Sequence, residues 1–401
     1  MKVTAIETIR LEGFPNLIWV QVHSDQGPVG LGESYFGPGA VEAHIHDFIA
    51  PYLLGQDPRA VERHAPRLLG YVGKGGSGAE MRAASAVDIA LWDLWGQATG
   101  QSVCQLLGGP SRESIRVYNT CAGTQYVRNT AAVKTDDFGL SAGPAGPDNP
   151  YEDLDGFLNR PVELARSLLD MGITAMKIWP FDFAAEASGG QYISDADLAK
   201  ALAPFAEISE ALGGEMEVMA ELHALWDLPS AKRIVGALDP FEPLWIEDPV
   251  RMDHLGSLAE VAGEVRAPIA TGETLGGKGQ FRDLLELDAA GVAIMDLVWG
   301  GGLTEARKVA AMCEAWHLPF AAHDCTGPVA LTASVHLALA APNVFIQEIV
   351  RAFYYGWYDE LVTALPPLWQ GRIRLPEGPG LGTQLNPEVA KRPDASVRRS
   401  E

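Results

Sequence analysis

The sequence has little positive charge to set against its negative charge. It carries 30 Lys and Arg residues against 52 Asp and Glu residues, for a formal net charge of −22 at pH 7. Nucleic acids and anionic membrane surfaces bind basic patches, so we expect neither as a partner. An anionic small molecule is still compatible, because a bound cation and one or two Lys or Arg residues can reverse the local sign.

Long apolar runs and paired cysteines are also missing. No stretch approaches the ~18–20 consecutive apolar residues of a transmembrane helix, so we expect no membrane span. The first ten residues contain Glu7 and Arg10 where a signal peptide requires an apolar core, and we interpret them as a strand of the mature protein. The four cysteines, at positions 104, 121, 313 and 325, form neither a Cys-x-x-Cys pair nor a disulfide-framework spacing. This usage predicts a reducing, cytoplasmic location.

What the chain does contain is a change of pattern near Ser111. Before it, alternating apolar residues over 1–34 predict an antiparallel meander, and helices are predicted at 41–54, 59–69 and 81–97. After it, short apolar strands alternate with helices, which is the pattern of a parallel α/β barrel. The eight predicted strands span 115–120, 174–179, 216–221, 243–247, 268–272, 292–296, 318–323 and 344–348. Residues after about 390 are polar and basic, and we expect them to be frayed.

Three glutamates recur at a fixed interval along the predicted barrel. Glu221, Glu247 and Glu273 each stand where an apolar run breaks into Pro, Gly or charge, and they are 26 residues apart. That interval is about one strand–helix–strand unit, so the three carboxylates should meet at the C-terminal face of the barrel. All-oxygen ligation suits a hard cation, Mg²⁺ before Mn²⁺ or Ca²⁺. The alternative, three unrelated solvent-facing glutamates, does not explain the common phase.

The next three strands also end in ionisable residues. Asp296, His323 and Glu348 follow Glu273 at intervals of 23, 27 and 25 residues. Asp296 is placed to accept an N–H of His323, which would fix the tautomer and raise the basicity that a general base needs. A hydrogen-bonded structural histidine is the alternative, but the position of His323 within the series favours function.

Two further candidate site residues are His223, next to the first glutamate, and Lys177, on an earlier predicted strand. His223 lies two residues after Glu221, and its side chain points to the same side if the strand pleat continues. Lys177 ends the second predicted strand and is a candidate for neutralising a substrate carboxylate, with a snorkelling lysine at the barrel rim as the alternative.

Four segments are candidates for covering this face and setting specificity, those around residues 14–36, 71–78, 122–156 and 351–358. The glycine-rich segment 71–78 lacks the flanking strand and Lys-Ser/Thr ending of a phosphate loop, so we predict a mobile loop. The insertion at 122–156 follows a strand and is rich in Gly and Pro, which favours a lid or substrate loop. An aromatic loop is predicted at 351–357.

These residues together resemble the enolase superfamily, mandelate racemase subgroup, over nearly the whole chain. The resemblance includes the helix at 83–93 followed by Leu106-Leu-Gly-Gly109, the segments Trp245-Ile-Glu247-Asp-Pro249 and Thr271-Gly-Glu273, the Asp296/His323 dyad, Glu348, and the tail Pro379-Gly-Leu-Gly382.

The resemblance implies an α/β fold, a (β/α)₇β TIM-like barrel with an α+β capping domain. We expect the cap at residues 1–111, the barrel at 112–350 and a C-terminal segment at 351–401 that returns to the cap. It also implies one Mg²⁺ per subunit held by Glu221, Glu247 and Glu273, and removal of the proton α to a substrate carboxylate.

The sequence departs from the family pattern at two positions. Members with a lysine base on the second strand carry Lys-x-Lys, whereas Trp179 stands in the second position here, and Glu221 replaces the usual aspartate as first ligand. The acid-x-His arrangement of the third strand is similar to the galactonate and mannonate dehydratases. That similarity assigns His223 the role of general acid.

The expected activity is therefore dehydration of an aldonate-type sugar acid to a 2-keto-3-deoxy acid. His323 would take the α-proton, His223 would protonate the departing β-hydroxyl, and Lys177 with a protonated Glu348 would stabilise the developing charge. A racemase or epimerase and a cycloisomerase, which share the enolate, are alternatives, as is a metal-retaining regulatory homologue without activity. We expect a homo-oligomer, between dimer and octamer, and a small acid sugar as the partner.

Overall fold

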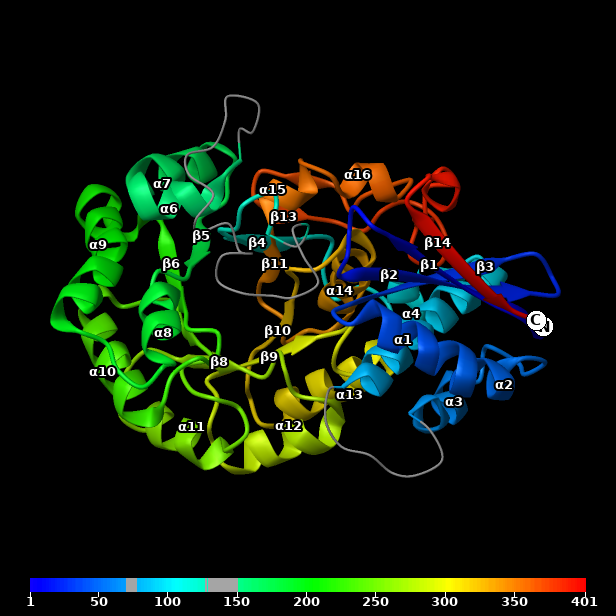
Figure 1. Ribbon diagram of the computed structural model, residues 1–401, viewed down its shortest axis with the longest axis horizontal. Helices are drawn as coiled ribbons and strands as arrows, with labels where there is room; N and C mark the ends of the chain where they lie inside the picture. The colour runs from blue at the N-terminus through cyan, green and yellow to red at the C-terminus, as the bar shows by residue number, and fades with distance from the viewer. Residues whose placement is uncertain (70–77, 127, 129–150) are drawn as a thin grey trace.

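The computed structural model describes residues 1–69, 78–126, 128 and 151–401. Figure 1 shows two parts side by side: a ring of strands wrapped by helices, and an antiparallel sheet with its own helices. Within the described residues, no helix is long and apolar enough to cross a membrane.

The first part of the chain forms the elements β1 (Val3–Leu11), β2 (Leu17–Ser24), β3 (Val29–Tyr35), α1 (Pro38–His44), the π-helical η1 (Ile45–Ile49), α2 (Ala50–Leu53), α3 (Val61–Leu68), α4 (Ala79–Thr99) and α5 (Val103–Leu106). The barrel strands are β4 (Ile115–Thr120), β5 (Ala175–Ile178), β6 (Glu217–Glu221), β7 (Ile246–Glu247), β8 (Ile269–Thr271), β9 (Val292–Asp296), β10 (Phe320–His323) and β11 (Gln347–Ile349). The helices among them are α6 (Asp153–Asn159), α7 (Pro161–Asp170), α8 (Asp182–Ser188), α9 (Asp195–Leu212), α10 (Leu228–Leu238), α11 (Leu255–Ala262), α12 (Gly277–Glu286), α13 (Gly302–Ala315) and α14 (Pro328–Ala340). Short 3-10 turns are η3 (Gly213–Glu215), η4 (Asp239–Phe241) and η5 (Val389–Lys391), and the chain closes with α15 (Arg351–Tyr354), α16 (Tyr358–Leu361), β12 (Leu368–Trp369), β13 (Arg372–Ile373) and β14 (Ala395–Ser400).

The smaller part is built on a four-stranded antiparallel sheet in the order β14-β1-β2-β3. Strands β1, β2 and β3 form the meander predicted for residues 1–34. The prediction of a frayed end after residue 390 is wrong, because β14 pairs along β1. The polar side chains of β14 are held as well: Ser400 Oγ lies 2.8 Å from His46 Nδ1, and Arg398 pairs with Asp47 at 3.0 Å. Backbone pairing thus orders a segment whose composition alone suggested a free end.

Helix α4 lies across this sheet and is buried over most of its length. Its close approach to β3 depends on two glycines. A Cβ at Gly30 or Gly32 would lie 1.9 Å from the carbonyl oxygen of Ala90 or Ala86, respectively. The helix backbone therefore packs directly on the strand, which no larger residue at these two positions would permit.

The larger part is a closed barrel of parallel strands. Strands β4 to β10 pair in sequence order and β11 pairs with β4. A parallel bridge between Phe320 of β10 and Val344, just before β11, completes the ring. Helices connect the successive strands and wrap the outside, as Figure 1 shows. The predicted (β/α)₇β barrel with an α+β cap is confirmed.

The local predictions differ from the structure mainly at element ends. Each of the eight predicted strands has a counterpart, with ends shifted by up to three residues. The aromatic segment at 351–357, predicted as a loop, begins with the short helix α15. The hairpin of β12 and β13, which extends β4 on its antiparallel side, was not predicted, because each strand is only two residues long.

Two aspartates of α4 tie the helix to the rest of the molecule. The Asp93 carboxylate accepts the backbone N–H groups of Leu31, at 2.7 Å, and of Leu381, at 2.8 Å. The Asp88 carboxylate accepts the backbone N–H of Thr304 in α13 at 2.9 Å. Burial raises the pKa of both aspartates to about 7, against the opposing effect of these hydrogen bonds. One helix therefore joins cap, barrel and C-terminal tail.

We predict that Asp93→Ala destabilises the whole chain. The substitution leaves two buried backbone N–H groups without an acceptor, at a cost of about 1–3 kcal/mol each. Denaturant unfolding followed by circular dichroism measures the change. Asp170→Ala, at the exposed end of α7, is the matched control and should change the unfolding free energy by less than about 0.5 kcal/mol. Equal stability of the two variants would contradict the role assigned to Asp93.

Candidate active site

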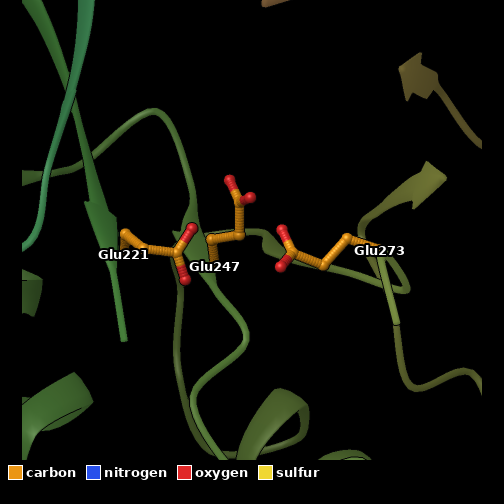
Figure 2. A group of neighbouring side chains, drawn as sticks. All are labelled: Glu221, Glu247 and Glu273. Atoms are coloured by element: carbon orange, nitrogen blue, oxygen red, sulfur yellow. The ribbon is translucent and has the colours of Figure 1, made fainter. Parts of the chain in front are cut away.

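Three glutamates meet where neighbouring barrel strands end. Glu221 and Glu247 are the last residues of β6 and β7, and Glu273 follows the end of β8 by two residues. Each offers one carboxylate oxygen to a group in which these atoms all lie within 4.8 Å of one another. Figure 2 shows the three side chains directed toward a shared space. The structure thus brings together the three residues that the sequence spacing singled out.

Lys177 of β5 lies against this group. Its Nζ is 2.6 Å from Glu247 Oε1, 3.0 Å from Glu221 Oε2 and 3.1 Å from Glu348 Oε1. Only 2% of the lysine is exposed, so the alternative of a snorkelling rim lysine is wrong. Burial acts to lower the pKa of Lys177, but the carboxylates, Glu247 first, raise it well above its ordinary value. The lysine is therefore a fixed positive charge inside an acidic group.

One ammonium does not balance the buried carboxylates around it. Burial and then the neighbouring Glu221 raise the pKa of Glu247 well above its ordinary value. Burial also raises the pKa of Glu273, with His323 opposing and Glu221 adding to the rise. A divalent cation would relieve this repulsion, and carboxylate oxygens are the ligands that Mg²⁺ prefers. On charge and donor chemistry, Glu221, Glu247 and Glu273 fit a metal site.

His323, at the end of β10, forms a buried pair with Asp296, at the end of β9. The His323 Nδ1 is 2.7 Å from Asp296 Oδ2, and Asp296 Oδ1 accepts the backbone N–H groups of Val298 and Trp299 at 2.7 and 2.9 Å. An aspartate held this way accepts the Nδ1–H, which leaves Nε2 facing Glu273 Oε2 at 3.3 Å. Burial lowers the pKa of His323, but Glu273 and Glu348 outweigh it and raise that pKa well above its ordinary value.

His223 reaches the same site by a different route from the one predicted. Strand β6 ends at Glu221, and the backbone of His223 turns into the left-handed region with φ 51°, so the argument from a continuing pleat is wrong. The ring is instead held by Asp182, whose Oδ2 lies 2.8 Å from His223 Nδ1. Burial lowers the pKa of His223, but Asp182 and Glu221 raise it to about 9.

Glu348 lies inside β11 and accepts hydrogen bonds on both oxygens. Oε1 receives the Thr120 hydroxyl as well as Lys177, and Oε2 receives the backbone N–H of Asp324 at 2.7 Å. Burial acts to raise the pKa of Glu348, but Lys177 and His323 lower it below its ordinary value. The prediction that Glu348 is protonated is therefore wrong for this structure, because its neighbours donate to a carboxylate.

A cavity of about 210 Å³ joins most of these residues. Six predicted site residues line it, namely Lys177, Glu221, His223, Glu273, His323 and Glu348. Tyr35, the last residue of β3 in the cap, and Phe36 after it line the cavity as well, so the cap forms part of the wall. A larger cavity, about 680 Å³ between α3, α4, α12 and α13, contains none of the predicted site residues.

Several residues of the site were missed from the sequence. Asp182 and Trp299 follow β5 and β9 by four and three residues, and position after a barrel strand was the signal that could have found them. Tyr35 and Phe36 lie in the segment 14–36 that was predicted to contribute to specificity, although neither residue was named individually. The segments 71–78 and 122–156, predicted as lids, lie largely outside the described residues.

A capped parallel barrel with carboxylates and histidines at its strand ends defines a class of barrel enzymes whose chemistry occurs at the C-terminal edge. The comparisons with known proteins identify the family. Residues 160–389 match the model of the enolase C-terminal domain-like family, and residues 3–108 match the mandelate racemase / muconate lactonizing enzyme N-terminal domain. The chain belongs to the enolase superfamily, mandelate racemase subgroup.

Relatives match along nearly the full chain. D-galactonate dehydratase of Ralstonia nicotianae is 32% identical over 400 residues, covering 96% of this chain and 92% of the relative. D-xylonate dehydratase of Haloferax volcanii is 28% identical over 392 residues, covering 96% and 87%. The crystal structure of an enolase of the mandelate racemase subgroup from Agrobacterium tumefaciens has a TM-score of 0.88 at 49% identity, covering 100% of this chain and 99% of that one.

We predict that Lys177→Met destabilises the metal-free protein by about 3–5 kcal/mol, since it removes one partner from a buried charge group. The loss should be largest near about pH 8 and smaller near about pH 5. Lys177 lowers the folded-state pKa of each of the four carboxylates around it, so its removal raises those pKa values. The variant therefore loses stability relative to the wild type as pH rises and the carboxylates ionise. Denaturant unfolding in EDTA at both pH values measures this. A pH-independent loss would contradict the electrostatic origin.

Proposed function

We propose that the protein is a Mg²⁺-dependent dehydratase of an aldonate-type sugar acid, which it converts to a 2-keto-3-deoxy acid. The observation that carries the proposal is the pair of histidines, each held by an aspartate, on one cavity beside a triad of carboxylates. The names of the relatives, D-galactonate dehydratase and D-xylonate dehydratase, support the reaction and the substrate class.

Glu221, Glu247 and Glu273 are the residues that would hold the metal, one Mg²⁺ per subunit. The donor set is all-oxygen, and the excess of buried negative charge among the three favours a divalent cation. When bound, Mg²⁺ supplies a Lewis acid for the substrate carboxylate. Lys177 lies beside the triad and lines the cavity, and we assign it to the same substrate carboxylate. Glu348 orients Lys177 as an ionised acceptor and does not act as a donor.

His323 is the general base of the proposal. Its Nε2 removes the proton α to the substrate carboxylate, while Asp296 holds the Nδ1–H and stabilises the imidazolium that forms. Two backbone N–H groups fix the second oxygen of Asp296, so the ring is oriented before substrate binds. The base must be neutral in order to work. Neutralising the charge of Glu273 would lower the pKa of His323, because Glu273 is the largest influence that raises it.

His223 is the general acid. Strands β6 and β10 are four apart in the eight-stranded ring, so His223 and His323 approach the cavity from opposite sides. A base on one side of the substrate can remove the α-proton while an acid on the other side protonates the β-hydroxyl, as an elimination requires. The same geometry favours a second candidate, an epimerase in which His223 returns the proton to the opposite face of the α-carbon.

We predict strict dependence on a divalent metal. Aldonic and aldaric acids incubated with Mg²⁺ should yield a 2-keto acid, measured as its semicarbazone, and EDTA should abolish the product. Glu247→Gln and Glu273→Gln should weaken Mn²⁺ binding, followed by electron paramagnetic resonance, since each removes a charged ligand. Glu314→Gln, on the exposed face of α13, is the matched control. Full turnover in EDTA, or unchanged Mn²⁺ affinity in both variants, contradicts the metal site.

We predict that the two histidines separate the steps. His323→Asn should lose both dehydration and exchange of the α-proton with D₂O, because no group then removes the proton. His223→Asn should lose dehydration but keep the exchange, and each loss should be about 10²–10⁴-fold. Proton NMR follows the α signal and the product together. Normal exchange by His323→Asn would overturn the base assignment, and inverted configuration at the α-carbon in the wild type would establish the epimerase.

A further inference from the structure

The two histidine–aspartate pairs of the site have the same contact but different surroundings. In both pairs an aspartate oxygen lies beside the histidine Nδ1, at 2.7 Å for Asp296 and 2.8 Å for Asp182. Asp296 also accepts two backbone N–H groups and so helps to hold the loop after β9. The second oxygen of Asp182 accepts no hydrogen bond from any described residue, although the aspartate is only 1% exposed.

This difference bears on why Asp182 is present. Burying a carboxylate costs free energy that hydrogen bonds normally offset. The hydrogen bonds of Asp182 secure no backbone segment, and the described partner of its side chain is the ring of His223. A residue needed only for packing would not have to carry this charge. We therefore attribute the presence of this carboxylate to its hydrogen bond with the His223 ring.

His223 needs an external support more than His323 does. His323 is the last residue of β10, whereas His223 lies beyond the end of β6 with φ 51°, followed by Ala224 with φ 53°. Its side chain is 23% exposed, against 6% for His323. The Trp179 ring meets the imidazole edge-on, with centroids 5.5 Å apart and planes at 75°, which limits the tilt of the ring but leaves its two nitrogens interchangeable.

We propose that Asp182 is a positioning residue that fixes the His223 ring with Nδ1–H toward the carboxylate and Nε2 toward the cavity. The inference rests on the proposed function for its consequence in catalysis. After His323 removes the α-proton, the electron pair of that C–H bond is held in the enolate of the substrate carboxylate. That pair then forms the double bond between the α- and β-carbons, which gives the enol of the 2-keto acid, as the β C–O bond breaks. The departing hydroxyl takes the Nε2 proton of His223 and leaves as water. Nδ1 keeps its proton, hydrogen-bonded to Asp182, so the ring ends neutral in a single tautomer.

The test compares Asp182→Asn with Asp296→Asn, two matched substitutions behind different histidines. Asp182→Asn should lower kcat for dehydration by at least about 10–100-fold, the range found when a carboxylate behind a metal-bound imidazole is removed. It should leave KM and α-proton exchange close to wild type, whereas Asp296→Asn should lower exchange and dehydration together. Added to His223→Asn, Asp182→Asn should cause no further loss, because the two residues act as a unit.

A measurement without substrate separates this inference from the proposed function. The ¹⁵N NMR signals of the His223 imidazole, identified by their absence in His223→Asn, should show protonated Nδ1 in the wild type. Asp182→Asn should shift or broaden those signals, and Asp182→Ser serves if the asparagine variant does not fold. Identical His223 signals in wild type and variant, or a loss of exchange equal to that of Asp296→Asn, would overturn the role of Asp182. If no acid is turned over by the wild type, the proposed function fails while the NMR result still decides the positioning role.

Discussion

The constraint on which the site depends is the forced convergence of carboxylates at one edge of the barrel. Glu221 and Glu247 are paired in register across β6 and β7, so backbone hydrogen bonds prevent the strand ends from moving apart. Their charges lie in a buried region where repulsion is far stronger than in water. Lys177 on β5 offsets part of this negative charge. His223, just after β6, and His323, at the end of β10, offset a further part. Every other polar feature of the site is arranged around this surplus of negative charge.

The barrel converts that constraint into directed chemistry. Because β6 and β10 lie opposite each other in the ring, their histidines cannot compete for one position beside the carboxylates. Each is held through Nδ1 by an aspartate from a neighbouring part of the barrel edge, which leaves one nitrogen of each ring for the cavity. A single fold thus holds two histidines, the groups to which we assign proton transfer, in fixed orientations. A divalent cation held by the acidic triad would bind a substrate carboxylate in the cavity that the two histidines share.

The sequence was sufficient to find much of the site because successive barrel strands end at similar intervals along the chain. The spacing of predicted strand ends was enough to find Glu221, Glu247, Glu273 and His323. The same reasoning failed for residues that lie beyond the end of a strand. His223 was placed by a pleat that does not continue, and its partner Asp182 is the first residue of α8, a helix whose position depends on packing. The ionised state of Glu348 was also missed, since it is set by the Thr120 hydroxyl, the Asp324 amide and Lys177, which only the tertiary structure brings together.

The aromatic residues that shape the cavity wall are different from the carboxylates and histidines proposed to do the chemistry. The Trp299 ring lies 5.1 Å from the His323 ring on one side and 5.6 Å from the Phe36 ring of the cap on the other, centroid to centroid. This aromatic contact, together with the Asp88 hydrogen bond of α4 to α13, sets the cap against the barrel mouth. Substitutions in the cap can therefore reshape the cavity without touching the carboxylates.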